Sequence, residues 1–310
     1  MDQSTSNQPI RQRKPEWLRA PSGSADALHD MRRLLRGLHL NTVCEEAACP
    51  NCGECFSRQT ATFLIMGPVC SRHCRFCQVS EGDPLPLDPQ EPEHVAEAVR
   101  RLGLRHVVIT SVTRDDLPDG GAAHFAAVIR TIKSASAGAG SESGQPAMAV
   151  PVIEVLIPDF QGDLSALKTI IAAQPDIINH NIETVRRLYD RVRPEADYDR
   201  SLKLIGRIRR LAPEIVSKSG LMVGLGETHE EVLQVMADLR GQACDILTIG
   251  QYLAPSRQHL PVADYIHPDQ FDRWKSAGLA MGFKSIAAGP LVRSSYMAEQ
   301  VSAGLLSRHT

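Results

Sequence analysis

Three cysteines in one short run are the residues of this sequence best suited to metal chemistry. Cys70, Cys74 and Cys77 are separated by three and then two residues, directly after an apolar stretch of strand length. Three thiolates this close can hold three irons of a [4Fe–4S] cube and leave the fourth iron open to a substrate. A closed zinc site with His73 as the fourth ligand is the alternative, but His73 lies between the cysteines, where wrapping one ion is awkward.

A second group of four cysteines lies earlier in the chain, at Cys44, Cys49, Cys52 and Cys55. All four could hold a closed cluster or a zinc ion, or three could bind while the fourth is incidental. No apolar leader precedes them, so we expect a cytoplasmic protein without disulfides. A dense cysteine block in a reducing compartment indicates metal or redox chemistry. The eighth cysteine, Cys244, opens a predicted strand and is expected in the core.

The elements that must position these cysteines alternate between short apolar runs and amphipathic stretches. The apolar runs predict strands at 61–66, 105–111, 152–157, 177–181, 215–223 and 245–250. The amphipathic stretches predict helices at 25–38, 92–102, 122–133, 164–172, 182–190, 199–211, 227–240 and 268–281, with a last strand at 284–288. Repeated βα units indicate a parallel sheet with helices outside it. Six units predict a partial (β/α)6 TIM-like barrel with N- and C-terminal extensions, and a doubly wound open sheet is the alternative.

Composition and charge limit the kinds of partner and indicate how the chain divides. The chain has 310 residues, 43% hydrophobic and 23% charged, with a net charge of -2, so no overall charge favours a nucleic-acid or membrane-surface partner. No apolar run approaches the ~20 residues of a membrane span. We expect an N-terminal extension (1–60), a barrel (61–260) and a C-terminal extension (261–310), with a Ser/Gly/Ala-rich surface insertion at 134–145. The first 40 residues hold seven Lys/Arg and four Asp/Glu, a local +3, which indicates a solvated basic arm or the docking of an acidic partner.

The later cysteine triplet resembles that of the radical S-adenosylmethionine (SAM) superfamily, because it follows the first strand of a predicted βα barrel. The resemblance implies that the open iron chelates the amino and carboxylate groups of SAM. Reduction of the cluster then cleaves SAM to methionine and a 5′-deoxyadenosyl radical, which takes a hydrogen atom from the substrate. Phe76 matches the superfamily position that lies near the adenine.

A narrower resemblance, to the lipoyl synthase family, extends over about residues 14–300. Cys44, Cys49 and Cys55, with their neighbours Thr42-Val43, Glu45-Glu46-Ala47 and Pro50-Asn51, look like the auxiliary-cluster motif of that family. Further matching segments lie at 14–19 (KPEWLR), 110–121 (TSVTRDDLPDGG), 179–184 (NHNIET), 218–228 (KSGLMVGLGET), 251–256 (QYLAPS), 259–262 (HLPV) and 289–296 (GPLVRSSY). Cys52 departs from the motif, where an apolar residue is expected, and we interpret it as a buried thiol.

This resemblance implies two [4Fe–4S] clusters and a sulfur-insertion reaction. Cys70, Cys74 and Cys77 would hold the SAM-cleaving cluster, and the earlier triplet would hold an auxiliary cluster whose fourth iron is bound by Ser295. Serine is a harder and more labile iron ligand than thiolate, which fits a cluster that is dismantled. The auxiliary cluster would donate both sulfurs to carbons 6 and 8 of a protein-bound octanoyl chain. The product would be a lipoyl group on a lysine of a lipoyl domain or carrier protein.

Several polar residues are expected to contact SAM or the substrate. Arg293 would steer Ser295 or pair with a bound carboxylate. Side chains near the ends of barrel strands point toward the ligand. This places a group of expected SAM and substrate contacts at Thr110, Ser111, Asn179, Asn181 and Lys218. The neighbouring His180 is either a core histidine or a further contact.

The expected partners follow from the same resemblance. They are an octanoylated lipoyl domain or carrier protein, an electron donor such as flavodoxin or ferredoxin, and an iron–sulfur carrier protein. No nucleic acid and no membrane is expected. Two other functions stay open: a different sulfur-inserting radical SAM enzyme similar to biotin synthase, and a zinc-stapled binding module in which the cysteine block is structural.

Overall fold

A curved, mostly parallel sheet forms the centre of the molecule. The computed structural model describes residues 13–19, 24–47, 49–57, 62–138, 150–296, 298–302 and 304–306. Its main sheet has the order β1-β2-β5-β6-β7-β8-β9-β10. The parallel strands are β2 (Thr62–Ile65), β5 (His106–Ser111), β6 (Val152–Leu156), β7 (Ile177–Asn179), β8 (Val216–Val223), β9 (Ile246–Gln251) and β10 (Ser285–Gly289). The short β1 (Asn41–Thr42) pairs antiparallel with β2 at the edge.

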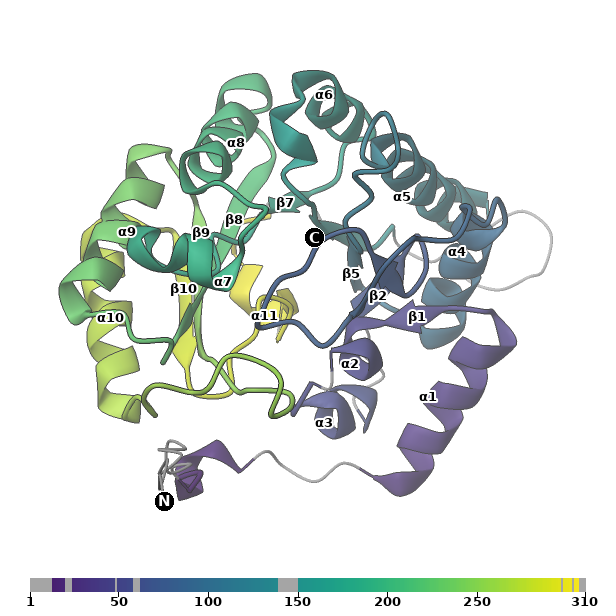
Figure 1. Cartoon of the computed structure of the whole chain (residues 1–310). Coiled ribbons are helices and arrows are strands. Elements are labelled where there is room, and N and C mark those ends of the chain that lie inside the picture. The colour runs from purple at the N-terminus through teal and green to yellow at the C-terminus, as the bar shows by residue number, and fades with distance from the viewer. Residues whose placement is uncertain are drawn as a thin grey trace, which may run out of the picture.

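Helices form a ring outside this sheet (Figure 1). They are α4 (Glu91–Leu102), α5 (Ala122–Gly138), α6 (Leu164–Ala172), α8 (Tyr198–Leu211), α9 (His229–Gly241) and α10 (Pro268–Ala280). The strands are buried on both faces, as in parallel sheets covered by helices. The predicted partial barrel is therefore confirmed. The described sheet does not close on itself, because its order ends at β1 on one side and β10 on the other.

The last predicted strand, at 284–288 in the expected C-terminal extension, belongs to the main sheet. β10 pairs in parallel with β9 from Ser285 to Gly289, so it continues the barrel sheet by one more strand. Behind it, α11 (Ala298–Ser302) covers the amino ends of the strands. There Val301, Leu305 and Leu306 pack against Ile177, Val216 and Ile246. This apolar cluster therefore covers the amino ends of β7, β8 and β9.

Residues 182–190 differ from the predicted helix. Glu183 instead pairs with Leu221 as an isolated parallel bridge, and its backbone N–H donates to the Gly220 carbonyl at 2.9 Å. Glu183 also has a φ of +65°, which no regular helix allows. Helical structure begins only at a 3-10 turn (Arg186–Leu188) followed by α7 (Tyr189–Val192). The apolar spacing of this segment therefore reflects packing of an extended loop.

The N-terminal part of the described chain stands beside the β1–β2 edge. The predicted helix 25–38 is present as α1 (Ala25–Gly37), which packs against α3 (Cys52–Ser57), and the short α2 (Val43–Glu46) contacts β1 and β2. Residues 1–12, 20–23, 48 and 58–60 of the expected extension lie outside the described residues. Most of the predicted insertion does too, since α5 runs to Gly138 and 139–149 are not described. No described helix is long and apolar enough to cross a membrane.

Candidate active site

A cavity of about 470 Å³ lies at the carboxyl ends of the barrel strands. Cys70, Cys74 and Cys77 line it, and Cys44 and Cys49 from the earlier cysteine group line it too. A barrel collects its functional side chains at this end of the strands. Two cysteine groups that are separate in the sequence therefore face one space.

The loop that carries the later triplet is fixed by its backbone. Its short strand β3 (Val69–Cys70) pairs with β4 (Ser80–Glu81), and the Ser71 N–H donates to the Thr113 carbonyl at 3.0 Å. At the far end of the loop, a ring nitrogen of His259 lies 3.0 Å from the Cys77 carbonyl. The Cys70 sulfur also accepts the Thr113 N–H at 3.3 Å. These contacts hold the three sulfurs against the cavity.

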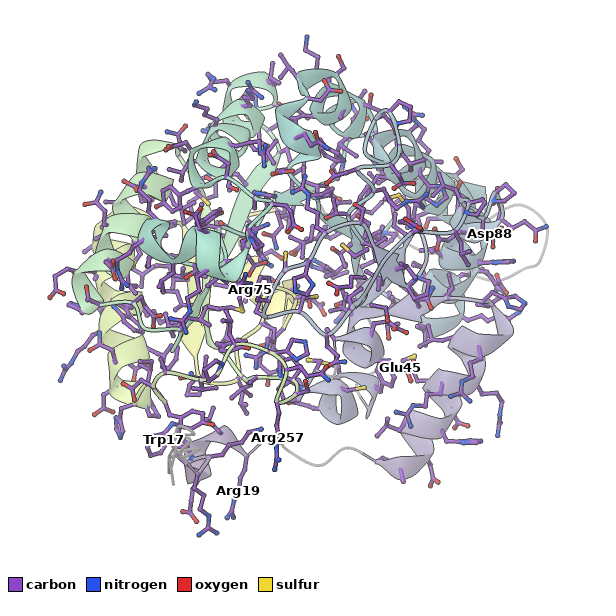
Figure 2. The ribbon with its side chains drawn as sticks, viewed as in Figure 1. Trp17, Arg19, Glu45, Arg75, Asp88 and Arg257 are labelled. Atoms are coloured by element: carbon purple, nitrogen blue, oxygen red, sulfur yellow. The ribbon has the colours of Figure 1, made fainter. Side chains whose placement is uncertain are left out.

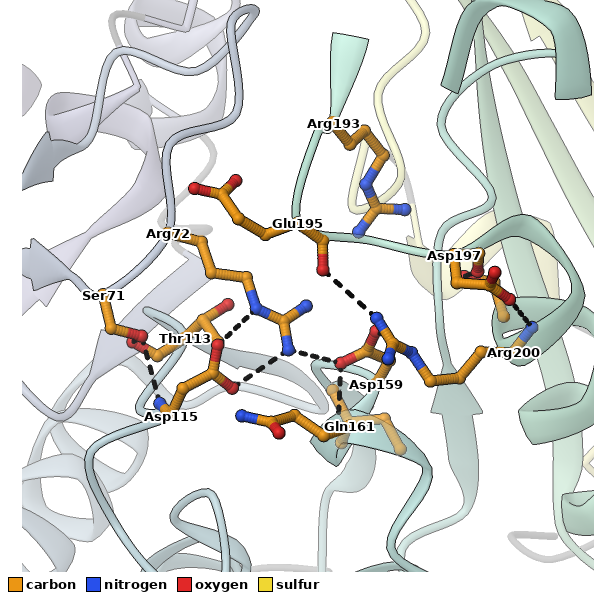
Figure 3. Close-up of polar contacts among 12 residues, drawn as sticks. Ser71, Arg72, Thr113, Asp115, Asp159, Gln161, Arg193, Glu195, Asp197 and Arg200 are labelled. Atoms are coloured by element: carbon orange, nitrogen blue, oxygen red, sulfur yellow. Dashed lines mark hydrogen bonds and ion pairs between the residues drawn. The ribbon is translucent and has the colours of Figure 1, made fainter. Parts of the chain in front are cut away.

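Arg72, inside the same loop, is the centre of a buried charge network (Figure 3). Its guanidinium contacts Asp115 at 2.5 and 2.9 Å and Asp159 at 2.8 Å. Asp159 is fully buried and is also bound by Arg200 of α8 at 2.8 Å. The network joins the cysteine loop to the loops after β5 and β6 and to α8. We infer that it fixes the position of the cysteine loop relative to the barrel.

Three of the cysteine thiols on the large cavity, those of Cys44, Cys74 and Cys77, lie in surroundings that disfavour their ionisation. Burial raises the pKa of Cys74 to about 11 and that of Cys77 to about 12. Burial likewise raises the pKa of Cys44 far above its usual range. A cation that binds such sulfurs must displace their protons, so metal binding and thiol ionisation are coupled here.

A smaller cavity of about 20 Å³ adjoins the large one. Cys44, Cys49, Cys55 and Ser295 line it, whereas Cys52 does not. Because Cys44, Cys49 and Ser295 also line the large cavity, the two spaces share a wall.

The segment with Ser295 is tied to the cysteine segment by two hydrogen bonds. The Asn51 amide donates to the Leu291 carbonyl at 2.8 Å, and the Tyr296 hydroxyl lies 3.0 Å from a carboxylate oxygen of Glu54. Segments about 240 residues apart in sequence are thereby held together, with the serine hydroxyl on the same small cavity as three thiols.

The cysteine sulfurs and the Ser295 hydroxyl, which are the candidate metal ligands, line cavities and do not converge on one position. In the described part of the chain, no three His, Cys, Asp or Glu side chains are placed to hold a single metal ion. Five thiols line the large cavity, and three thiols line the small one together with the Ser295 hydroxyl. Sulfur donors suit iron–sulfur groups, so the chemistry of both donor sets, and not the volume of the small cavity, favours clusters. The residues present are therefore compatible with clusters at both places.

Most of the expected SAM and substrate contacts reach the large cavity. Phe76, Thr110, Ser111, Asn181 and Arg293 line it. The Ser111 hydroxyl and the side-chain amide oxygen (Oδ1) of Asn181 are buried and have no hydrogen-bond partner among the described residues. Buried polar atoms normally have partners, so these two are suited to a bound polar ligand.

Asn179 and Lys218 were expected to contact SAM or the substrate, but they lie in the barrel interior, away from the cavity. Both point to Glu154 in the barrel interior, with the Lys218 ammonium 2.7 Å and the Asn179 amide 3.4 Å from the same carboxylate oxygen. Neither lines the cavity. The reason is the fully buried Glu154, which requires a cation, and His106 lies 3.3 Å from its other oxygen. Glu154, within an apolar strand pattern, was the signal that the sequence analysis passed over.

Two further charged residues of the cavity wall were not singled out from the sequence. Arg193 donates to the Asn181 carbonyl at 3.0 Å, and its Nε has no partner in the described chain. Glu183 accepts from the Asn181 amide at 3.0 Å, and burial raises the pKa of its carboxyl. Glu183 belongs to the segment 179–184, but its positive φ, which aims it at the cavity, is not visible in the sequence.

Comparison with known proteins assigns the family. The sequence pattern of the radical SAM superfamily matches residues 64–239, more than half of the chain. The lipoyl synthase of Caldanaerobacter subterraneus subsp. tengcongensis is 58% identical over 287 residues, which cover 93% of this chain and 96% of that protein. The chain belongs to the lipoyl synthase family.

Other lipoyl synthases agree with this assignment. The proteins of Alkaliphilus metalliredigens and Thermus thermophilus are 55% and 49% identical, over 93% and 95% of this chain and 95% and 88% of theirs. The expectation from the two cysteine triplets and the terminal RSSY is thereby confirmed. A protein similar to biotin synthase and a zinc-stapled module are set aside.

Solved structures agree on the fold alone. The crystal structure of Streptococcus suis SuiB bound to S-adenosylmethionine superimposes with a TM-score of 0.51 at 10% sequence identity. The match covers 88% of this chain and 58% of that one. At this identity the match supports the fold, a partial barrel, and no more.

Proposed function

We propose that this chain is a lipoyl synthase, a radical SAM sulfurtransferase that inserts two sulfur atoms at carbons 6 and 8 of a protein-bound octanoyl-lysine. The observation that carries the proposal is the meeting of both cysteine triplets and Ser295 at two adjoining cavities. Family membership over 93% of the chain supports the same activity.

The two triplets would hold different clusters. We assign Cys70, Cys74 and Cys77 to the SAM-cleaving [4Fe–4S] cluster, because a triplet leaves one iron open toward the cavity. The small cavity supports a second cluster on Cys44, Cys49, Cys55 and Ser295. When bound, the clusters would supply an electron to SAM and sulfur to the substrate.

The cavity walls suit two kinds of substrate. Ser111, Asn181 and Arg193 present unpartnered polar atoms, which suit the charged and polar groups of SAM. Gly220 leaves room for the Asn181 side chain, since an added Cβ there would lie 2.5 Å from its side-chain amide oxygen. We keep Phe76 and Thr110 as further SAM contacts and Arg293 as the residue that steers Ser295.

The apolar part of the wall suits an acyl chain. It is formed by Leu64, Val112, Leu156, Ile157, Met222 and Leu253. An octanoyl chain that enters there replaces water along apolar surface, which favours binding and keeps solvent from the reacting carbons. Binding of the chain thus brings its carbons between the two triplets.

The partners follow from this chemistry. An octanoylated carrier protein is the substrate. Reduction of the first cluster requires an external one-electron donor, for which flavodoxin or ferredoxin is suited. An iron–sulfur carrier would rebuild the second cluster after its sulfur is used. The cysteines of both sites form no disulfide within the described part of the chain, which suits the reducing cytoplasm.

Anaerobic turnover of an octanoyl-lysine peptide tests the proposal. With SAM and dithionite, the reconstituted protein is expected to convert the peptide to the lipoyl form, detected by mass spectrometry. Cys74→Ala is expected to abolish SAM cleavage, whereas Cys49→Ala should retain SAM cleavage and lose sulfur transfer. Cys52→Ala is the matched control and should retain both. Absence of sulfur in the wild-type product would refute the function.

A further inference from the structure

Exposed basic side chains come from three segments beside the large cavity, and Figure 2 labels Arg19, Arg75 and Arg257 among them. We call this set the basic rim. It consists of Arg13, Lys14, Arg19, Arg75 and Arg257. Residues 13–19 hold three cations against one carboxylate, Glu16, whereas the whole chain has a net charge of -2.

The three segments that supply the basic rim adjoin one another. Lys14 lines the cavity, and Trp17 packs edge-to-face on His267, with ring centroids 5.1 Å apart. The loop after β9, which carries Arg257, is bonded to the cysteine loop, because the Leu260 N–H donates to the Arg75 carbonyl at 3.2 Å. The N-terminal segment, the cysteine loop and the loop after β9 therefore form one continuous edge.

The charges of the basic rim are not used within the protein. Arg13, Lys14, Arg75 and Arg257 form no ion pair with any residue that the structure describes. Arg19 lies 3.7 Å from Glu16, but both side chains are more than three-quarters exposed. Such exposed pairs contribute little to stability, so the basic rim stays available to a partner.

We propose that the basic rim is the docking surface for the carrier protein, and that it selects carriers with an acidic face around the octanoyl-lysine. This inference rests on the proposed function. The octanoyl chain is tethered to its carrier, so the carrier surface must rest on the mouth while the chain reaches the cavity. Opposite charges there raise the rate of encounter and fix the orientation. Trp17, 40% exposed within the same segment, supplies an aromatic contact.

A charge-reversal variant tests the surface with two substrates. Arg13→Glu/Arg19→Glu/Arg257→Glu changes the basic rim but spares Lys14 and Arg75, which belong to the cavity wall and the cluster loop. The control is Arg130→Glu/Lys168→Glu/Lys275→Glu, with the same change of charge on the outer helices α5, α6 and α10. Each enzyme is assayed with an octanoylated acidic lipoyl domain and with an uncharged octanoyl-lysine peptide.

The expected result is selective for the acidic domain. Reversal of the rim should raise KM for the domain about tenfold or more at low salt and leave kcat within about twofold. KM for the peptide should stay within about twofold, and the control variant should resemble the wild type with both substrates. Added salt should weaken wild-type turnover of the domain but not of the peptide.

Other results would overturn the inference without touching the function. An unchanged KM for the domain would do so, as would equal losses with the domain and the peptide. Turnover of a domain with neutralised carboxylates as efficient as that of the acidic domain would also contradict it. Failure of the proposed function is distinct, because the wild type would then yield no lipoyl product from either substrate.

Discussion

Replacement of Arg72 by Met should destabilise the protein more than any exposed arginine change in the same loop. The Arg72 side chain is 5% exposed and is shared between Asp115, which is 25% exposed, and Asp159, which is fully buried. Breaking a buried pair costs about 3–5 kcal/mol, because the remaining charge loses its partner. Asp159 keeps Arg200 at 2.8 Å, so we expect the lower end, about 3 kcal/mol.

A double variant separates the loss of the charge pair from the loss of side-chain packing. Arg72→Met/Asp159→Asn removes both a cation and the carboxylate that it serves. The double variant should recover about 1–2 kcal/mol relative to the sum of the single variants, because partners in one network are coupled. Arg75→Met is the matched control. It is exposed in the same loop and should change stability by less than about 0.5 kcal/mol.

Urea unfolding of the reduced, cluster-free protein measures these differences, since bound clusters would break two-state behaviour. Iron analysis after reconstitution gives a second readout. Arg72→Met should lose iron from the SAM-cleaving site because its cysteine loop is released. A loss of less than about 1 kcal/mol for Arg72→Met, or strict additivity in the double variant, would refute the role assigned to this network.

Three further predictions concern the cavities. Ser295→Cys is expected to retain SAM cleavage and reduce sulfur transfer at least about tenfold, because thiolate is a firmer iron ligand than serine; wild-type product formation would contradict this. Cys52→Ala should keep the iron and sulfide content of the wild type, and loss of one cluster's iron would show that the triplet is misassigned. Burial, aided by Arg193, lowers the pKa of His180 to about 4. Because the unfolded chain takes up this proton first, stability should fall as pH drops from about 7.5 to about 5, by about 2 kcal/mol more in wild type than in His180→Gln; equal pH profiles would contradict it.

Much of the barrel could be predicted from apolar periodicity. Helix 164–172 coincides with α6, and β5 begins one residue after its predicted start. This strand could be predicted because its buried, β-branched run is short and bounded by turn residues. The segment 182–190 could not be predicted, since extended residues that bridge to β8 bury the same apolar spacing as a helix does. The parallel pairing of β10 depends on contacts with β9, which are distant in sequence.

The candidate site also contains residues that the sequence predicted and residues that it could not predict. The cysteine spacings predict metal chemistry, because thiolates close in sequence are close in space. Ser295 came from the family resemblance alone, and its placement beside Cys44 depends on bonds such as Asn51 to Leu291 across the molecule. Lys218 was misplaced because its buried partner Glu154 lies on another strand. Partners of this kind are set by tertiary packing, which local pattern does not report.

The central claim is that two cysteine triplets hold two clusters, of which one is consumed as the sulfur source. Iron and sulfide analysis with Mössbauer spectroscopy, before and after one turnover with an octanoyl-lysine peptide, tests it most directly. The account predicts about eight irons and eight sulfides per chain at the start, and loss of the second cluster's signal as lipoyl product forms. About four irons at the start, or an unchanged spectrum after product has formed, would contradict it.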